Sequence, residues 1–349
     1  MNAALVGQLP PGPLDIVGDV HGEIDALEAL LAALGYAADG RHPGGRRLVF
    51  LGDLVDRGPD SPGVLNKVQD LVVAGRAHCL LGNHELNLLR DVQKHGNDWW
   101  VNPGKPAEHP ARPLDPTDKP RFISFLQSLP VVLEREDLRV VHACWHEAAV
   151  ASLRAARRDA LTLFVGQQAR LRDEWSRTGL WDRFVDEWRT HGRRLSQRHP
   201  APEFLPAMAT VDSRNQMDNP VAVLTSGAER PAAAPVWAGG RWRMVERVTW
   251  WDDYADDVPV VIGHYWRRYS AAGKALMDEH GPDVFAGVAP HHWMGRNNNV
   301  YCVDFSVGGR YVERAAGLPN FQCRLAALRV PEWSVVHDDG ETWQIGPPG

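Results

Sequence analysis

The sequence is poor in cysteine and contains no long apolar segment. Its four cysteines, Cys79, Cys144, Cys302 and Cys323, are widely scattered and form no Cys-x-x-Cys pair. This spacing excludes a zinc ribbon and argues against a disulfide framework. No apolar run reaches the roughly 18 residues that a membrane-spanning helix needs. The first basic residue is Arg41, so the N-terminus lacks the positive region of a secretory signal. These absences predict a soluble, cytoplasmic protein that does not bind membranes.

The chain also lacks an excess of positive charge. It has 38 Lys and Arg against 44 Asp and Glu, a formal net charge of −6, which gives no electrostatic reason to expect binding to a nucleic-acid duplex. With 44% apolar and 23% charged residues, the composition excludes disordered and coiled-coil proteins. A chain of 349 residues can bury a full core without disulfides. The oligomeric state stays open.

Strand and helix patterns alternate through the first third of the chain. Short apolar runs at residues 14–17, 47–51 and 77–81 predict buried strands. A helix is predicted over residues 23–34, a second begins at the N-cap signal Ser61-Pro62, and a third follows residue 85. This order predicts a βαβ series on a parallel sheet. Ligands bind such sheets at the carboxyl ends of the strands.

The middle of the chain has a different composition. Residues 151–200 hold 11 Arg, no Lys and 6 acidic residues, so this segment carries +5. Trp181, Phe184, Val185 and Trp188 recur at helical spacing and predict a packed helix face. The arginines predict either a solvated face or attraction of an anionic substrate. Further strands are expected at 138–145, 258–262, 300–303 and 322–330. We therefore expect one α/β domain over residues 1–349, with residues 147–219 as a helical, cap-like insertion.

Three polar clusters follow the first three predicted strands. They are Gly18-Asp19-Val20-His21-Gly22, Gly52-Asp53-Leu54-Val55-Asp56-Arg57-Gly58 and Gly82-Asn83-His84-Glu85. Each begins with glycine, which permits a sharp turn. Carboxylate, amide and imidazole groups are typical ligands of first-row divalent metals. Taken singly, Asp19 and Asp53 could merely cap helices, and His142 and His264, at later strand ends, could be core histidines. Their joint presence favours a metal site.

These clusters resemble the motifs of the calcineurin-like metallophosphoesterases, in particular the phosphoprotein phosphatase superfamily of serine/threonine protein phosphatases and diadenosine tetraphosphatases. The resemblance covers residues 18–85 and the two later histidines, whereas residues 150–240 match no motif. It implies a β-sandwich with flanking helices and two divalent metal ions at the carboxyl ends of the strands. Manganese is expected first, with iron, zinc and cobalt as alternatives.

The resemblance also implies a role for each motif residue. Metal ligands come from all three clusters and both later strands: Asp19 and His21 for one ion, Asn83, His142 and His264 for the other, and Asp53 as the bridge. His84 would protonate the leaving oxygen, Asp56 would orient His84, and Arg57 would bind the phosphate. The family also uses a second phosphate-binding arginine, for which six positions stay open: Arg230, Arg241, Arg243, Arg247, Arg267 and Arg268.

The resemblance predicts a phosphatase that cleaves phosphomonoesters by attack of a metal-bridging hydroxide. Phosphoserine and phosphothreonine in proteins are the leading substrates, because Glu85 in Gly-Asn-His-Glu favours protein phosphatases. One alternative is a hydrolase of dinucleoside polyphosphates such as diadenosine tetraphosphate, whose charge would suit the +5 segment. A second alternative is a catalytically silent phosphoprotein-binding module, against which the intact motifs argue. The expected partner is thus a phosphorylated protein or a small phosphoester.

Overall fold

The computed structural model describes residues 4–103, 111–269 and 282–349. Two β-sheets form its centre. The strand order of the first sheet is β13-β12-β11-β2-β3-β4 and that of the second is β1-β5-β6-β9-β10. The strands of the first sheet are β2 (Leu14–Val17), β3 (Arg47–Phe50), β4 (Ala77–Cys79), β11 (Ala326–Val330), β12 (Ser334–His337) and β13 (Thr342–Gln344). Those of the second are β1 (Val6–Gln8), β5 (Val132–Arg135), β6 (Leu138–Val141), β9 (Val260–Ile262) and β10 (Val300–Cys302).

The parallel arrangement predicted for the first third is confirmed. β2, β3 and β4 run parallel, with Ile16 opposite Val49 and Phe50 opposite Cys79. The parallel neighbours β6, β9 and β10 form the matching part of the second sheet. The carboxyl ends of these strands therefore point to the same edge of the sandwich.

Alternating side chains on the strands build two cores. Ile16 and Val49 pack with Val140 and Val261 of the other sheet, which forms the core between the sheets. Their neighbours in sequence, such as Phe50, belong to the core beneath the helices. Strands buried on both faces explain why the sequence shows continuous apolar runs here. The predicted sandwich with flanking helices is confirmed.

The three helices predicted for the first third are confirmed as α1 (Ile24–Leu34), α2 (Ser61–Val73) and α3 (Asn83–Leu89). Three further helices flank the sandwich, α4 (Asp98–Val101), α5 (Lys119–Gln127) and α11 (Arg310–Ala315), with 3-10 turns at Trp250–Asp252 and Val307–Gly309. The cap predicted for α2 is wrong by one residue. Asp60 is the N-cap, and its carboxylate accepts the N–H of Gly63 at 2.7 Å, while Ser61 is the first helical residue.

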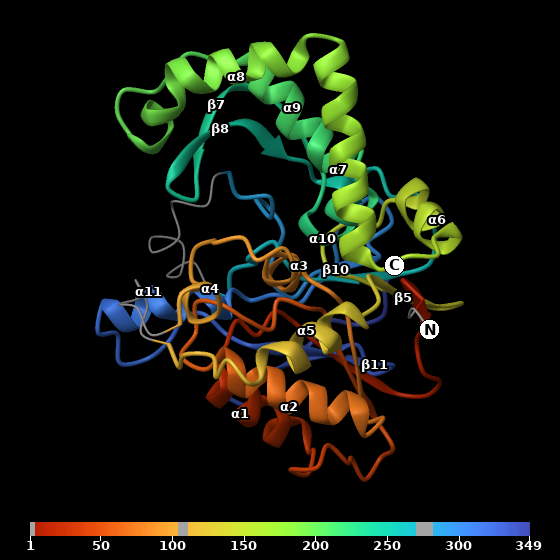
Figure 1. Ribbon diagram of the computed structural model, residues 1–349. Helices are drawn as coiled ribbons and strands as arrows, with labels where there is room; N and C mark the ends of the chain where they lie inside the picture. The colour runs from red at the N-terminus through yellow and green to blue at the C-terminus, as the bar shows by residue number, and fades with distance from the viewer. Residues whose placement is uncertain (1–3, 104–110, 270–281) are drawn as a thin grey trace.

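Residues 147–247, which include the arginine-rich segment, form a layer at one end of the molecule, called the helical layer below. Its elements are α6 (Glu147–Ala155), α7 (Ala160–Arg177), α8 (Leu180–His191), a 3-10 turn (Gly192–Ser196), α9 (Pro206–Met217) and α10 (Pro220–Ser226), followed by the hairpin β7 (Glu229–Ala238) and β8 (Arg241–Arg247). Figure 1 shows α7, α8, α9 and the hairpin on the side of the sandwich opposite α1 and α2. None of the helices in the described ranges is long and apolar enough to cross a bilayer.

The helical layer has small apolar cores of its own. Trp175 packs with Leu171 and Leu180, and Trp181 stacks on Phe184 with ring centroids 4.9 Å apart. The packing predicted for Trp188 is wrong, since this side chain is 47% exposed. Helix α8 lies at the outer surface, where the Trp188 ring is covered in part by Arg241 of β8, whose guanidinium carbon lies 6.0 Å from the ring centroid.

A buried ion-pair network ties the first sheet together far from the motif edge. The carboxylate of Asp15, on β2, is fully buried. It accepts hydrogen bonds from Arg46 at 2.8 Å, from Arg329 on β11 at 2.9 Å, and from the Tyr36 hydroxyl at 2.8 Å. Arg46 also pairs with the half-exposed Glu332 at 2.8 Å, whereas Asp15 is the carboxylate partner of Arg329 within the described residues.

We predict that Asp15→Ala lowers the free energy of unfolding by about 3 kcal/mol, because Arg329 loses its carboxylate partner and the buried Arg46 keeps only the half-exposed Glu332 as an ion-pair partner among the described residues. Urea denaturation measures the change. Asp39→Ala is the matched control, because Asp39 pairs with Arg41 on the surface, where both side chains are more than half exposed, and a change of about 0–1 kcal/mol is expected. Equal losses in both variants would contradict a structural role for the network.

Candidate metal centre

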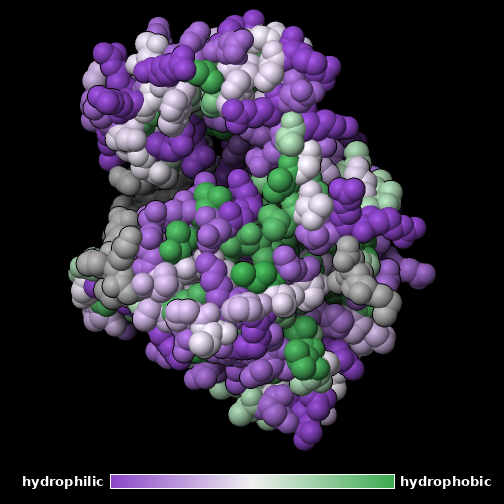
Figure 2. Space-filling view, in the orientation of Figure 1, coloured by the Kyte–Doolittle hydropathy of each residue, from purple (hydrophilic) through white to green (hydrophobic). Residues whose placement is uncertain are grey.

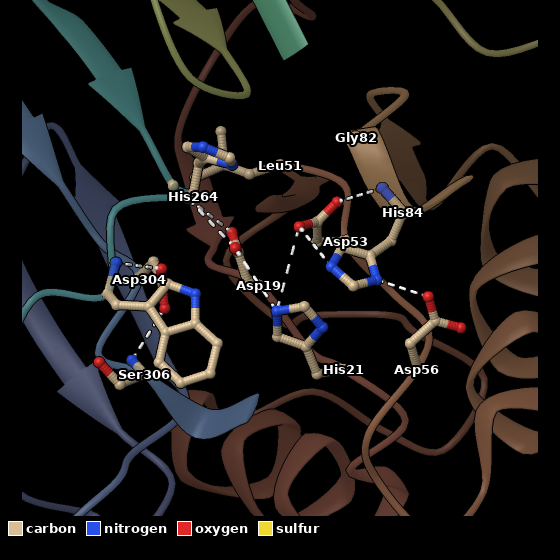
Figure 3. A network of polar contacts seen from close by, with 12 residues as sticks. Asp19, His21, Leu51, Asp53, Asp56, Gly82, His84, His264, Asp304 and Ser306 are labelled. Atoms are coloured by element: carbon tan, nitrogen blue, oxygen red, sulfur yellow. Dashed lines mark hydrogen bonds and ion pairs between the residues drawn. The ribbon is translucent and has the colours of Figure 1, made fainter. Parts of the chain in front are cut away.

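The polar clusters meet at one edge of the sandwich. Asp19 follows β2, Asp53 follows β3, and Asn83 begins α3 directly after β4. From the second sheet, His142 follows β6 and His264 follows β9. Figure 3 shows Asp19, Asp53, His21, His84 and His264 converging on a common space. The structure thus brings together all the predicted metal ligands, including the two histidines that are distant in sequence.

The backbone of the site adopts an unusual conformation. Five predicted site residues have positive φ angles, which non-glycine residues rarely adopt: His21 (48°), Asp53 (47°), Asp56 (75°), Arg57 (71°) and His264 (69°). Each such residue costs free energy, and clusters of them occur at functional sites, where the surrounding structure holds them in place. Gly82 shows how tightly the loops approach one another, because a Cβ atom there would overlap Oδ1 of Asp53.

Asp53 occupies the centre of the cluster. Its Oδ2 lies 3.4 Å from Nε2 of His142, 3.9 Å from Nε2 of His84 and 4.0 Å from Nε2 of His21. Its Oδ1 accepts the backbone N–H of His84 at 2.9 Å. Although burial opposes ionisation, His142 and His84 hold the pKa of Asp53 well below its usual range. An ionised carboxylate surrounded by three imidazoles is suited to bridge two cations.

Asp19 supplies a second buried carboxylate. Its oxygens accept the backbone N–H of His264 at 3.1 and 3.2 Å, and Oδ2 lies 3.9 Å from Nε2 of His21. Burial, together with the nearby carboxylates of Asp304 and Asp53, raises the pKa of Asp19 well above its usual range. In the described parts of the chain no lysine or arginine forms an ion pair with Asp19 or Asp53. Buried carboxylates of this kind need a cation.

The histidines are oriented by backbone carbonyls. Nδ1 of His21 lies 3.0 Å from the Val55 carbonyl, and Nδ1 of His142 lies 2.8 Å from the Leu51 carbonyl. Each ring therefore presents Nε2 to the carboxylates, as metal-binding histidines commonly do. The Asn83 amide lies between His142 and His264. Its Oδ1 is 3.3 Å from Nε2 of His142 and 2.9 Å from Nδ1 of His264.

The donor set fits two divalent ions. The ligand atoms of Asp53, His142 and His264 lie within 4.8 Å of one another, and so do those of His21, Asp53 and His84. Asp53 belongs to both groups, as the predicted bridging role requires. Mixed imidazole and carboxylate donors suit manganese, iron, zinc and cobalt.

His84 is held by a buried carboxylate. Its Nδ1 lies 2.5 Å from Oδ2 of Asp56, and the other oxygen of Asp56 accepts the indole N–H of Trp99 at 2.8 Å. The Ser61 hydroxyl accepts the backbone N–H of Asp56 at 2.9 Å. These contacts direct Nε2 of His84 towards the cavity. Sequence analysis missed Trp99 and Ser61, because neither belongs to a motif.

Glu85 has a structural role that the sequence did not indicate. It is fully buried, and its carboxylate accepts the backbone N–H groups of Asp53 and Leu54 at 2.8 Å and of Gly82 at 3.0 Å. Burial and the nearby Asp53 raise the pKa of Glu85 to about 7. Glu85 therefore joins two motif loops and does not line the cavity. Because Glu85 does not face the cavity, it gives no physical reason to prefer protein substrates.

Asp304 performs a similar task on the second sheet. It accepts the backbone N–H groups of Trp266 and Ser306, each at 2.8 Å.

Arg267, one of the candidate phosphate ligands, follows in the same turn and is buried. Its guanidinium donates to the carbonyls of Ala289 at 2.8 Å and His292 at 2.6 Å. The structure therefore excludes Arg267 as a phosphate-binding residue.

The other arginine candidates differ in their surroundings. Arg230 pairs with Glu246 at 2.8 Å, and Arg268 lies 3.5 Å from Asp283. Arg247, at the end of β8, is close enough to His264 to lower its pKa, after the larger effect of burial. Within the described residues the Arg247 side chain has no ion pair, and its guanidinium lies 5.5 Å from the Tyr265 ring. Arg57 lies beside His21, with its Nη1 2.8 Å from Nε2 of His21.

A cavity of about 980 Å³ lies over the cluster. Asp53, Asn83, His84 and His264 line its floor, and residues of α7, α9, α10 and the hairpin line its other walls. Figure 2 shows the surface hollowed between the helical layer and the sandwich. Six basic side chains line the cavity: Arg57, Arg90, Lys94, Arg230, Arg243 and Arg247.

The arginines of residues 151–200 do not line this cavity. From that segment only Phe164 and Gln168 reach its wall. Several of the arginines form exposed pairs instead, such as Arg177 with Asp173 at 3.2 Å. The predicted solvated face is therefore correct for this segment, and the basic character of the cavity comes from residues outside it.

Comparison with known proteins agrees with this geometry. The calcineurin-like phosphoesterase family matches residues 12–199, more than half of the chain. The bis(5'-nucleosyl)-tetraphosphatase PrpE [asymmetrical] of Oceanobacillus iheyensis is 35% identical over 141 residues, which cover 37% of this chain and 54% of the relative. The symmetrical bis(5'-nucleosyl)-tetraphosphatase of Ralstonia nicotianae is 43% identical over 84 residues, covering 24% of this chain and 26% of the relative.

The chain spans about half the length of the PrpE relatives that it matches. Among solved structures, the cold-active protein-tyrosine phosphatase of a psychrophilic Shewanella is 15% identical with a TM-score of 0.47, covering 97% of this chain and 83% of that one. The family match spans the three motifs and His142, which confirms the resemblance on which the predictions were based. The chain belongs to the calcineurin-like phosphoesterase family.

Proposed function

We propose that this protein hydrolyses dinucleoside polyphosphates. The observation that carries the proposal is the roofed cavity over the metal ligands, with six basic side chains around its wall. A phosphoserine in a folded protein requires an open site, whereas a nucleotide with several phosphates fits a deep basic one. The names of the two relatives support the same substrate class. The alternative derived from the sequence is thus favoured over the phosphoprotein phosphatase.

We assign the metal ligands as the resemblance implies. Asp19 and His21 hold one ion, Asn83, His142 and His264 hold the other, and Asp53 contacts both. Manganese is the proposed metal. When bound, the two ions supply a nucleophilic water at neutral pH and neutralise charge on the phosphate. Asp53 is ionised and fixed by Glu85, so it can hold this place without rearrangement.

The remaining site residues act on the substrate. His84 delivers a proton from Nε2 to the leaving oxygen, and Asp56 keeps its ring in the required orientation. Arg57 and Arg247 flank the cluster and bind the oxygens of the phosphate under attack. Arg57 is stacked over Trp266, with its guanidinium carbon 4.6 Å from the ring centroid. We select Arg247 as the second phosphate-binding arginine, because its half-buried side chain lines the cavity, lies close to His264 and forms no ion pair among the described residues.

We further propose that the insertion of residues 147–219 works as a cap within the single domain of residues 1–349. Phe164, Gln168, Asn215 and Gln216 of this insertion line the cavity. The hairpin β7–β8, which follows the insertion, completes the wall. A cap built in this way excludes water and large phosphoproteins from the metal ligands.

A substrate comparison tests the proposed function. With manganese added, we expect kcat/KM for diadenosine tetraphosphate to exceed that for a phosphoserine peptide and for p-nitrophenyl phosphate. The reason is that the basic side chains of the cavity wall can bind additional phosphates. A preference for the phosphopeptide would restore the protein phosphatase interpretation. Metal binding without turnover of any of the three would favour the phosphoprotein-binding module.

Removal of the bridging carboxylate tests the metal assignment. We predict that Asp53→Asn loses both bound metal and turnover, since a neutral amide cannot compensate two cations. Elemental analysis of the purified protein and steady-state rates measure the two effects. Asp257→Asn, in the exposed acidic loop, is the control and should retain both. Normal metal content and rate in Asp53→Asn would refute the bridging role.

The role of His84 is tested by leaving-group dependence. We predict that His84→Asn keeps the metal content but lowers kcat for a phosphoserine peptide, whose alkoxide leaving group must be protonated, by roughly 10²–10⁴, the usual scale of general acid catalysis. The loss should be much smaller for p-nitrophenyl phosphate and for diadenosine tetraphosphate, whose phenolate and phosphate leaving groups are stable anions at neutral pH. Equal losses for the phosphopeptide and p-nitrophenyl phosphate would instead indicate that His84 acts as a metal ligand, as its place beside His21 and Asp53 also permits.

A further inference from the structure

Three basic side chains gather on the cavity wall away from the metal ligands: Arg90, Lys94 and Arg243. Arg90 caps the C-terminus of α3, Lys94 lies in the following turn, and Arg243 comes from β8. Helix α3 begins at Asn83, so Arg90 lies about 10 Å along the helix axis from a proposed metal ligand. A single phosphate group bound at the metal ions does not reach this far.

Carboxylates lie near this basic cluster but do not form ion pairs with it. Within the described residues, no carboxylate forms an ion pair with Arg90, Lys94 or Arg243. Asp212 and Glu229 are close enough to feel the charge of Arg243 but do not pair with it. Lys94 is exposed to the cavity, yet partial desolvation lowers its pKa, and the neighbouring Arg90 and Arg243 lower it further. Like charges held together on a cavity wall are unfavourable unless an anion binds between them.

The cluster is also held in position before any ligand binds. The buried Asn97 accepts the backbone N–H of Lys94 at 2.9 Å and fixes the turn. The next carbonyl in this turn, that of Gly96, accepts the backbone N–H of Arg57 at 3.2 Å. Arg90 is held by an aromatic partner, with its guanidinium carbon 4.5 Å from the Phe164 ring centroid. The turn that carries Lys94 is thus fixed relative to the phosphate-binding Arg57.

We propose that Arg90, Lys94 and Arg243 form a second anion-binding site, which holds the phosphates of a polyphosphate chain beyond the phosphate that is hydrolysed. The identification of the ligand as a polyphosphate-linked nucleotide rests on the proposed function, whereas the site itself requires only a chain of several phosphates. Two anchors separated along one cavity select substrates by length. A monophosphate contacts the metal-ligand end alone, and a longer chain contacts both ends.

Binding of inorganic phosphates tests this site without reference to nucleotides. Titration calorimetry of the manganese-loaded protein, with manganese in excess throughout, gives the Kd of tripolyphosphate and of phosphate. We expect the wild type to bind tripolyphosphate far more tightly than phosphate. Lys94→Met and Arg243→Met should each weaken tripolyphosphate at least about tenfold relative to phosphate, since each removes a charge-assisted hydrogen bond. Lys67→Met, which removes a surface lysine whose Nζ contacts the Ala38 carbonyl, is the control and should keep the wild-type ratio.

The outcomes separate the second site from the proposed function. Unchanged tripolyphosphate binding in both Lys94→Met and Arg243→Met would overturn the second site, even if diadenosine tetraphosphate is a good substrate. A lost preference for tripolyphosphate supports the site, even if diadenosine tetraphosphate is not hydrolysed and the proposed function fails. Where the tetraphosphate is a substrate, the same variants should raise its KM with little change in kcat.

Discussion

The placement of one buried carboxylate, Asp53, governs the rest of this site. It must face His142 from the second sheet, 3.4 Å away, while its own strand lies in the first. This requires the carboxyl ends of parallel strands from both sheets to meet at one edge. It also requires a left-handed backbone at Asp53 and a glycine at position 82, where a side chain would displace the carboxylate. Glu85 compensates the strained turn by accepting the N–H groups of Asp53 and Leu54.

The electrostatics of the fold divide it into two ends with opposite properties. At the motif edge, Asp19 and Asp53 are buried without a paired lysine or arginine among the described residues, so the folded chain is incompletely compensated there until cations bind. On the same strand as the first motif, Asp15 is fully compensated by Arg46 and Arg329. Asp15 on β2 thus stabilises the sheet, whereas Asp19, just after β2, stays available to bind a cation. The stabilising Asp15 and the cation-binding candidate Asp19 are only four residues apart in sequence.

Sequence analysis succeeded where the relevant forces are local. The strands and the glycine-led turns were predicted because apolar runs and turn residues act over a few positions, and the motif resemblance supplied His142 and His264. Long-range contacts were beyond its reach. Arg267 adjoins His264 in sequence, yet positive φ angles at His264 and Trp266 turn the chain so that its guanidinium meets the Ala289 carbonyl. Glu85 belongs to a motif, but its partners lie some thirty residues away in the turn after β3.

The division of labour between the sandwich and the helical layer follows from these contacts. The proposed metal ligands all come from loops that follow strands of the sandwich, a region that the family match largely spans. The cavity wall comes in part from α7, α9 and the β7–β8 hairpin, and the hairpin lies outside the matched residues 12–199. In the proposed function, hydrolysis would need only the geometry of the strand ends, because the reacting phosphate is the same in every substrate. Discrimination among substrates would need contacts farther along the molecule, and the proposal assigns those contacts to Arg243 and Arg247 on the hairpin. Changes in the hairpin would then alter which phosphoester is chosen without disturbing Asp19 and Asp53.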